Sequence, residues 1–194
     1  EKKNILFFSN GTCKNIAKIH CKDLNSFVKT VSYYSTWIAC FGIWKNDFDS
    51  LEGFSKNYSL QLVQTDVLLR LISLNRTVEV DNTKLFNSIS PTTKGGYNIY
   101  KIFVTNYLGL LEECRKKNQL SRITLFNEKS KLLIFFLIPW SFRMWKDKTQ
   151  YSFDKKGGLN ILLEKYRFHP VLYIGAIYFC LKIFSDVLGN LSKK

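Results

Sequence analysis

The chain has 194 residues, of which 46% are hydrophobic and 15% aromatic, with only three prolines. A chain of this length can bury a substantial core without disulfides or a metal, and its hydrophobicity excludes an intrinsically disordered protein. Its 29 Lys and Arg residues outnumber its 15 Asp and Glu residues and give a net charge of +14, which favours an anionic partner but does not choose among nucleic acid, acidic lipid and acidic peptide.

The N-terminal segment is predicted to form a turn followed by a short helix. Asn10-Gly11 is typical of a turn after a short apolar start. Beyond it, Ile16, Ile19 and His20 would share one face of a helix, because residues three and four apart lie on the same side.

The next segments carry stronger helical patterns. Apolar residues recur at spacings of three and four over 24–41, which predicts a helix of about five turns with Asp23 or Asn25 as its N-cap. A second stripe predicts a helix over 60–74. The residues at 77–82 include several β-branched ones and favour an extended segment.

The C-terminal half is predicted to be helical apart from one hinge. Apolar stripes predict four helices there, over 100–111, 130–145, 159–167 and 170–188. Pro139 is expected to kink the second of them or to end its first half. The segment 150–158, which contains Lys155-Lys156-Gly157-Gly158, is predicted to be a polar hinge, either a native loop or a shortened, spliced one.

These patterns predict an all-α fold, a single domain over 1–194 built as one bundle of seven to nine helices. They favour a protein folded in water over a membrane protein. The longest stretch without charge is Thr30 to Trp44, and Lys182 interrupts the next longest run, Phe168 to Leu181. Spanning a bilayer takes about 20 predominantly apolar residues with few or no charges.

Signatures of catalysis are absent from the sequence. It contains no GxSxG, HExxH, GxxxxGK[ST] or GxGxxG motif, so we expect that the protein is not an enzyme. Five cysteines without a CxxC pair favour free thiols in a reducing compartment. Four glycosylation-type triplets point instead to a secreted protein and leave that alternative open; they begin at Asn10, Asn57, Asn75 and Asn190.

His20 is the candidate metal ligand. The usual role of a lone histidine is a surface or half-buried one with a hydrogen-bond partner. Zinc requires four nitrogen or sulfur donors. Cys13 lies seven residues before His20, on the same face of a helix, whereas Cys21 would point elsewhere. A zinc site at His20 would therefore take its remaining ligands from a partner. The other histidine, His169, precedes Pro170 and is expected to cap a helix.

Exposed apolar side chains are the other candidate site. The chain carries more large apolar residues than one bundle readily buries. Part of the N-terminal stripe is therefore a candidate docking surface for a partner's amphipathic helix, with the protein core as the equally open alternative; it comprises Ile16, Ile19, Leu24 and Phe27.

The stretch Ala17-Lys18-Ile19-His20-Cys21-Lys22-Asp23-Leu24 resembles the bridging subunit of the fission-yeast shelterin telomere complex. That family has a helical, dimerising fold similar to the telomere-repeat-factor homology domain. The resemblance extends to chain length and to the overall helical pattern. It implies an adaptor without enzymatic activity, located in the nucleus at telomeres.

The resemblance also implies partners and a cofactor. One surface would bind a peptide from the single-strand-binding side of the complex and another a peptide from the Rap protein on the duplex side. Zinc would be shared at the first interface, with His20 as this chain's single ligand. A homodimer would be possible, and neither direct DNA contact nor a membrane is expected. Two alternatives remain: a peripheral membrane or secreted protein, and a basic DNA-binding domain.

Overall fold

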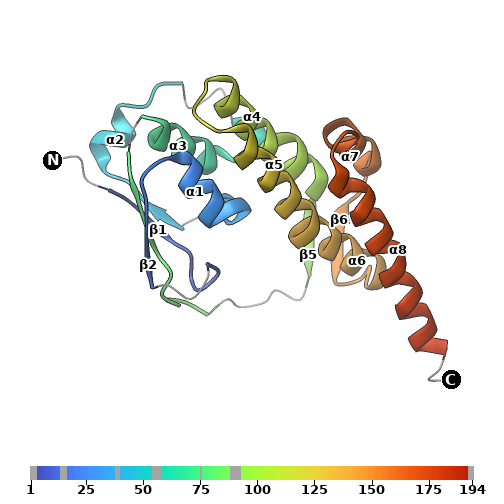
Figure 1. Cartoon of the computed structure of the whole chain (residues 1–194). Coiled ribbons are helices and arrows are strands. Elements are labelled where there is room, and N and C mark those ends of the chain that lie inside the picture. The colour runs from blue at the N-terminus through green and yellow to red at the C-terminus, as the bar shows by residue number, and fades with distance from the viewer. Residues whose placement is uncertain are drawn as a thin grey trace. The chain divides into compact units, whose positions relative to one another are not determined.

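Figure 1 shows the computed structural model of the chain, which describes residues 4–13, 17–37, 40–53, 58–74, 76–87 and 93–191, with side chains as far as residue 189. The chain divides into two compact units. Unit 1 comprises Glu1–Ser90 and Asn106–Glu128, and unit 2 comprises Pro91–Thr105 and Lys129–Lys194.

Unit 1 combines a sheet with helices. Its strands are β1 (Ile5–Phe8), β2 (Lys18–Cys21), β3 (Phe41–Gly42) and β4 (Val78–Asp81). Its helical segments are α1 (Leu24–Val31), the 3-10 turn η1 (Ser32–Thr36), α2 (Lys45–Asp49), α3 (Val63–Ser73), α4 (Leu108–Lys116) and most of α5 (Arg122–Lys131). The strand order is β2-β4-β1-β3, with β1 parallel to β4 and the two outer pairs antiparallel.

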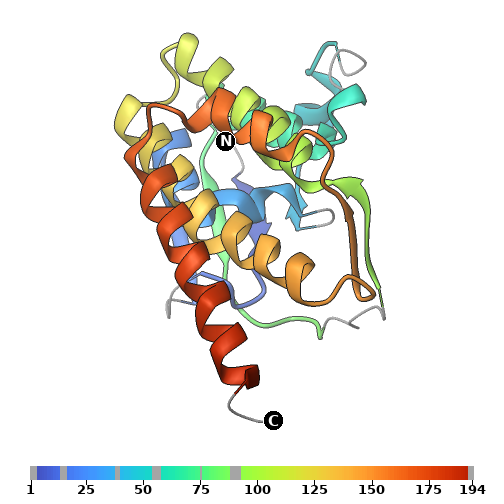
Figure 2. The ribbon, with the colours of Figure 1, turned by 90° about the vertical axis from the view of Figure 1, so that its right-hand side faces the viewer.

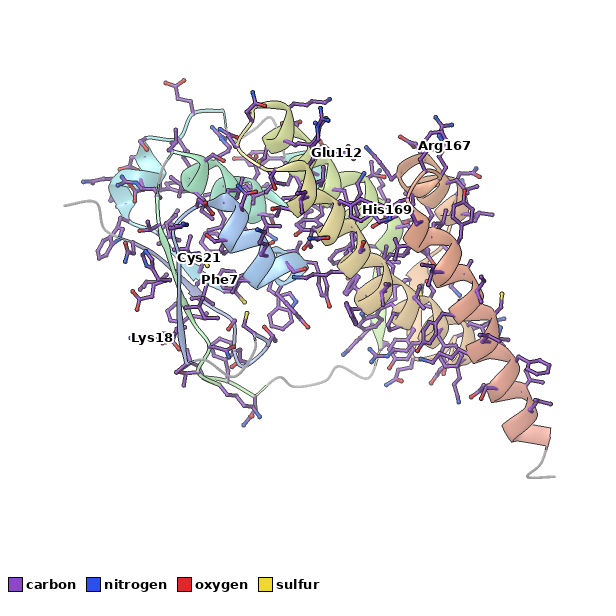
Figure 3. All side chains as sticks on the ribbon, in the orientation of Figure 1. Phe7, Lys18, Cys21, Glu112, Arg167 and His169 are labelled. Carbon is purple, nitrogen blue, oxygen red and sulfur yellow. The ribbon has the colours of Figure 1, made fainter. Side chains whose placement is uncertain are left out.

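The sheet contradicts the predicted all-α fold, and its core explains why the strands form. Side chains of β1 alternate: Ile5 and Phe7 are fully buried, while Leu6 between them is 42% exposed. Phe7 points to α1, where its ring meets the Phe27 ring edge-on with centroids 5.6 Å apart (Figure 3). A period of two with one buried face is the strand pattern, so unit 1 is an α/β module. The extended segment predicted at 77–82 is confirmed by β4.

The long helix predicted over 24–41 is interrupted at Ser32. Asp23 is the N-cap of α1, as predicted, and shares a capping box with Ser26. At Ser32 the backbone adopts φ 57° and ψ −147°, a region that side chains rarely tolerate. The Ser32 hydroxyl donates to the Glu128 carboxylate at 2.8 Å, and the Tyr107 hydroxyl donates to the same carboxylate at 2.9 Å. Helix α1 thus ends at a buried group of hydrogen-bonded side chains formed by Ser32, Tyr107 and Glu128.

Unit 2 contains a two-stranded parallel pair and a set of helices. Its elements are β5 (Lys94–Asn98), most of the π-helical turn η3 (Lys101–Tyr107), the π-helical turn η4 (Leu132–Leu137), α6 (Ile138–Lys146), β6 (Tyr151–Asp154), α7 (Gly158–Tyr166) and α8 (Pro170–Leu191). The Trp140 ring on α6 covers β6, because it lies edge-on to Tyr151 and Phe153 with centroids 5.6 and 5.4 Å away. Gly95 is required at the strand pair, since a Cβ there would lie 2.5 Å from the backbone carbonyl carbon of Ser152.

Pro139 does not end its helical segment. The π-helical turn η4 directly precedes α6, and Pro139 lies in the first turn of α6. Proline removes one hydrogen bond and crowds the carbonyl one turn back. The local π-helical widening is a recognised way for a helix to adjust its hydrogen-bond ladder.

Candidate functional site

The predicted zinc ligand lies on the sheet. His20 is exposed on β2, opposite Glu79 of β4 in the antiparallel ladder. Cys21 follows it and points to the other side of the strand, where it is fully buried. Burial raises the pKa of the Cys21 thiol, which therefore stays protonated at neutral pH. Among the residues that the structure describes, no group of three or more His, Cys, Asp and Glu could hold a metal ion. A zinc site completed by a partner remains a prediction.

The predicted docking residues do not form one surface. Ile19 is half-buried on β2, whereas Leu24 and Phe27 are 2% and 0% exposed in the core of unit 1. Ile16 lies outside the described residues, as do Asn57 and Asn75 of the glycosylation-type triplets. Leu24 and Phe27 therefore stabilise the fold and are inaccessible to a partner.

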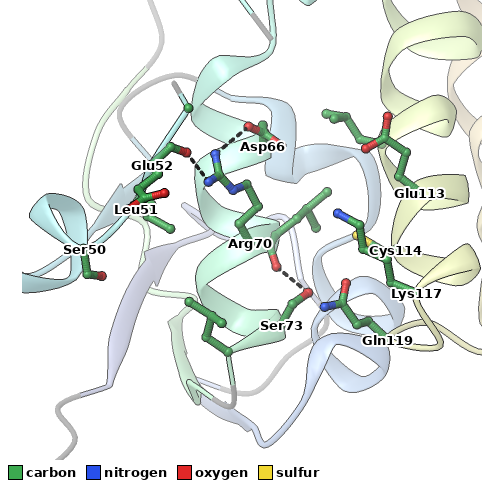
Figure 4. A pocket seen from close by; sticks show the side chains of 14 residues that line it. Ser50, Leu51, Glu52, Asp66, Arg70, Ser73, Glu113, Cys114, Lys117 and Gln119 are labelled. Carbon is green, nitrogen blue, oxygen red and sulfur yellow. Dashed lines mark hydrogen bonds and ion pairs between the residues drawn. The ribbon is translucent and has the colours of Figure 1, made fainter. Parts of the chain in front are cut away.

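Unit 1 has a polar pocket of about 460 Å³ between α3, α4 and the segment after α2 (Figure 4). Arg70 reaches across it, lying 3.5 Å from the Asp66 carboxylate and donating to the Glu52 carbonyl. Glu113 of α4 and Lys117, which directly follows α4, lie on the other side in Figure 4. The pocket thus carries charges of both signs and suits a polar molecule.

The thiol in this pocket is not an activated nucleophile. Cys114 is 8% exposed, and its burial raises the pKa of the thiol to about 11. A nucleophilic cysteine needs a lowered pKa and a base beside it. The described lining of the pocket contains no histidine.

The last helix of unit 2 has the most unusual surface in the described chain. α8 is 22 residues long and begins at Pro170, as predicted; His169 caps it by accepting from the Val171 amide at 3.4 Å. Figure 2 shows α8 as a long helix beside α6. Its window Pro170–Gly189 has a mean hydropathy of 1.8, and only 11% of the window is buried. The large apolar side chains at least 40% exposed are Tyr173, Ile174, Ile177, Tyr178, Leu181, Phe184, Val187 and Leu188.

The two charged residues of α8 lie on its inner side. Asp186 forms an ion pair with Lys146 of α6. Lys182 places its ammonium 4.6 Å from the centre of the Phe142 ring, also on α6. Both side chains are half-buried, along with Leu172 and Phe179 of the same helix. The outward face of α8, defined as the exposed residues from Tyr173 to Leu188 other than Ala176, therefore carries no charge.

This surface fits a membrane-spanning or membrane-inserted helix better than the two common alternatives. The core helix of a protein folded in water is mostly buried, whereas this helix is exposed. A signal sequence lies near the N-terminus of its precursor, whereas 169 residues precede α8 here. The length of uninterrupted uncharged runs does not reveal this helix, because Lys182 divides its apolar stretch. The mean hydropathy of the window, which tolerates isolated charges, is the signal that identifies this helix.

Basic and aromatic residues accompany the apolar helix in unit 2. This unit has 14 Lys and Arg residues against four Asp and Glu residues, so it carries +10 of the chain's +14. The Arg143 guanidinium lies 4.9 Å from the centre of the Trp140 ring, and the Arg167 guanidinium lies 4.7 Å from that of Phe168. Arg167 sits at the end of α7, beside the start of α8 (Figure 3). Trp residues are enriched at the level of the lipid headgroups, and Lys and Arg are enriched in the loops that flank membrane helices.

In comparisons with known proteins, no family model, no curated protein and no solved structure matches this chain. The resemblance to the shelterin bridging subunit therefore remains a prediction, together with the adaptor role, the partners and the telomeric location that it implies. Its segment Ala17 to Leu24 contains strand β2 and not the predicted helix.

Proposed function

We propose that this chain is a membrane-attached protein in which the outward face of α8 contacts the hydrocarbon of a lipid bilayer. In this proposal unit 2 is the attachment module. The observation that carries the proposal is the exposure of eight large apolar side chains on one helix whose two charges both face inward.

The dimensions of α8 support the proposal. A helix of 22 residues is about 33 Å long, and the hydrocarbon core of a bilayer is about 30 Å thick. Burying a fully exposed Leu, Ile or Phe side chain contributes about 1.5–3 kcal/mol. Ile174, Ile177 and Leu181 are each a little over 60% exposed, so lipid contact would remove a large apolar area from water.

A native cysteine tests the proposal. Cys180 is exposed on the outward face of α8, whereas the other four cysteines of the chain are buried. A water-soluble maleimide should label Cys180 in the protein without lipid and fail to label it after binding to phosphatidylcholine–phosphatidylglycerol vesicles. The variant Cys180→Ala identifies the labelled site, because it should remove the lipid-sensitive signal.

The protein should also float with the vesicles in a density gradient. If Cys180 were labelled equally in the lipid-free protein and in gradient fractions that contain both protein and vesicles, the proposal would be contradicted.

A further inference from the structure

Unit 2 contains a second pocket, of about 320 Å³, between Tyr100, which directly precedes η3, and η4, α6, α7 and α8. Its volume lies at the lower end of the range of about 300–1,000 Å³ for ligand pockets. Leu133 and Leu137 of η4, Leu162 of α7 and Phe179 of α8 contribute to an apolar wall. The exposed lining residues include Lys155 and Leu159, so the pocket is open beside them.

The two hydroxyl groups that line the pocket, those of Tyr100 and Ser141, already donate hydrogen bonds within the protein. Ser141 Oγ donates to the Leu137 carbonyl at 2.7 Å, which leaves the Tyr100 hydroxyl to donate to Ser141 Oγ, also at 2.7 Å. Neither hydroxyl proton is available to a ligand. The interior therefore favours an apolar occupant.

One cation lies at the opening. Lys155 is the only Lys or Arg among the described residues that line the pocket. Its ammonium donates to the Met144 carbonyl at 3.1 Å, which holds it beside α6. An ammonium has three donors, so two remain for an anion. The pocket thus combines an apolar interior with a positively charged rim.

Two glycines lie where the walls of the pocket approach closely. A Cβ at Gly158 would lie 2.6 Å from the Tyr100 ring, and one at Gly175 would lie 2.6 Å from Ile138 Cδ1. At Gly158 the neighbour is an aromatic ring, so the close approach of α7 to Tyr100 depends on a residue without a side chain, whereas at Gly175 the neighbour is the end of the Ile138 side chain, which can move aside. The inner face of α8 forms one wall of the pocket, and the opposite face of the same helix is the proposed lipid contact.

We propose that this pocket binds one acyl chain of an anionic phospholipid from the bilayer, with the lipid phosphate at Lys155. The proposal rests on the proposed membrane attachment and adds the lipid class and its site. Because one wall of the pocket is formed by α8, the helix that contacts the bilayer in the proposed function, the pocket would lie close to lipid acyl chains. The net charge of +10 on unit 2 favours an anionic headgroup over a zwitterionic one.

Photo-crosslinking tests the site separately from the attachment. The probe is phosphatidylglycerol with a diazirine on one acyl chain, mixed into phosphatidylcholine vesicles, and crosslinked positions are mapped by mass spectrometry. We expect adducts on α7 and on the inner face of α8, at Leu162 and Phe179, in addition to adducts on the outward face. Phosphatidylcholine carrying the same diazirine should give few adducts inside the pocket.

Matched variants define the pocket. Lys155→Gln should lower the yield of pocket adducts about tenfold, because it removes a charge-assisted hydrogen bond, whereas Lys156→Gln at the exposed neighbouring position should leave it unchanged. Ala176→Phe, which fills the pocket from α8, should abolish pocket adducts, whereas Ile177→Phe on the outward face should not. Both lysine positions are exposed, so these two variants should fold normally.

The outcomes separate the two proposals. Adducts confined to the outward face of α8 would overturn the pocket proposal and leave membrane attachment intact. Equal pocket yields from the two labelled lipids, or equal losses from Lys155→Gln and Lys156→Gln, would overturn the assignment of an anionic lipid. A protein that fails to bind any vesicle would contradict the proposed function itself.

Discussion

A charge placed on the outward face of α8 should abolish membrane attachment, and Ile177 is the position to change. It is 63% exposed and lies about 4 Å along the axis from the midpoint of Pro170–Gly189. On insertion scales, isoleucine at a helix centre contributes about −0.5 kcal/mol and aspartate about +3 kcal/mol. Ile177→Asp should therefore cost about 3–4 kcal/mol, which lowers vesicle partitioning on the order of several hundred-fold.

Ile123 provides a matched control. It is also an exposed isoleucine on a helix, 72% exposed on α5, but it belongs to unit 1. Ile123→Asp makes the same chemical change outside α8 and should leave vesicle flotation unchanged. Surface substitutions of this kind usually change stability by less than about 0.5 kcal/mol, so circular dichroism should show that both variants are folded.

The assay is flotation of purified protein with phosphatidylcholine–phosphatidylglycerol vesicles over a range of lipid concentrations. The midpoint of the binding curve should move to much higher lipid for Ile177→Asp alone. Equal shifts in both variants, or a shift in neither, would refute the reasoning that the outward face of α8 enters the hydrocarbon.

Three further predictions concern unit 1 and the effect of salt. Ser32→Ala should destabilise the protein by about 2 kcal/mol in urea unfolding, because Glu128 loses a buried donor. Ser32→Gly should cost about 1 kcal/mol less, because it also relieves the backbone strain at this position. Equal losses of stability in the two variants would exclude strain at Ser32. Hydrogen bonds from Ser26 lower the pKa of the Asp23 carboxyl group. The stabilisation of α1 by Asp23 should therefore be present above the ordinary carboxyl pKa and be lost as the pH falls through the lowered value. If the difference in unfolding free energy between wild type and Asp23→Ala does not become smaller in acid, this prediction is contradicted. High salt present before vesicles are added should slow binding to the vesicles, because exposed charges are screened. Salt added after binding should not release the protein from the vesicles, because apolar contacts hold it there. Full release by salt would exclude insertion of α8 into the bilayer.

The eleven-residue helix α3 was predictable from its periodicity, whereas of the short strands only β4 was predicted, from its β-branched residues. α3 lies inside the predicted 60–74, because an eleven-residue stripe distinguishes a period of 3.6 from a period of two. Lys18–Cys21 is only four residues long, and Ile19 and His20 fit either pattern in such a short segment. Pairing with β4 decided the strand, and that partner lies about 60 residues away in the sequence. Periodicity alone could not supply that contact.

The end of α1 shows a second limit. The apolar stripe continues past Val31, so the pattern predicts further helical turns. The helix ends because Ser32 adopts a strained conformation while its hydroxyl reaches Glu128, 96 residues further along the chain. A local pattern contains no information about such a distant acceptor.

The same limit explains why the apolar face of α8 was missed. In the sequence, Lys182 and Asp186 divide an apolar run and argue against a bilayer. In the fold, both charges turn toward α6, where Lys146 and the Phe142 ring receive them, and the outward face is left uncharged. The candidate site therefore depends on which residues of α8 face α6 and which face away from it.

The distribution of charge also weighs against nucleic acid as the anionic partner. If the basic excess served nucleic acid, the Lys and Arg residues would be expected to form a polar surface that tracks phosphates. Here +10 of the net charge belongs to unit 2, the unit whose longest helix exposes Ile174, Ile177 and Leu181 to solvent. Exposed apolar side chains gain nothing from a phosphate backbone, whereas a bilayer with anionic headgroups satisfies both the charge and the apolar face. A single partner thus accounts for two features that the composition alone left unconnected.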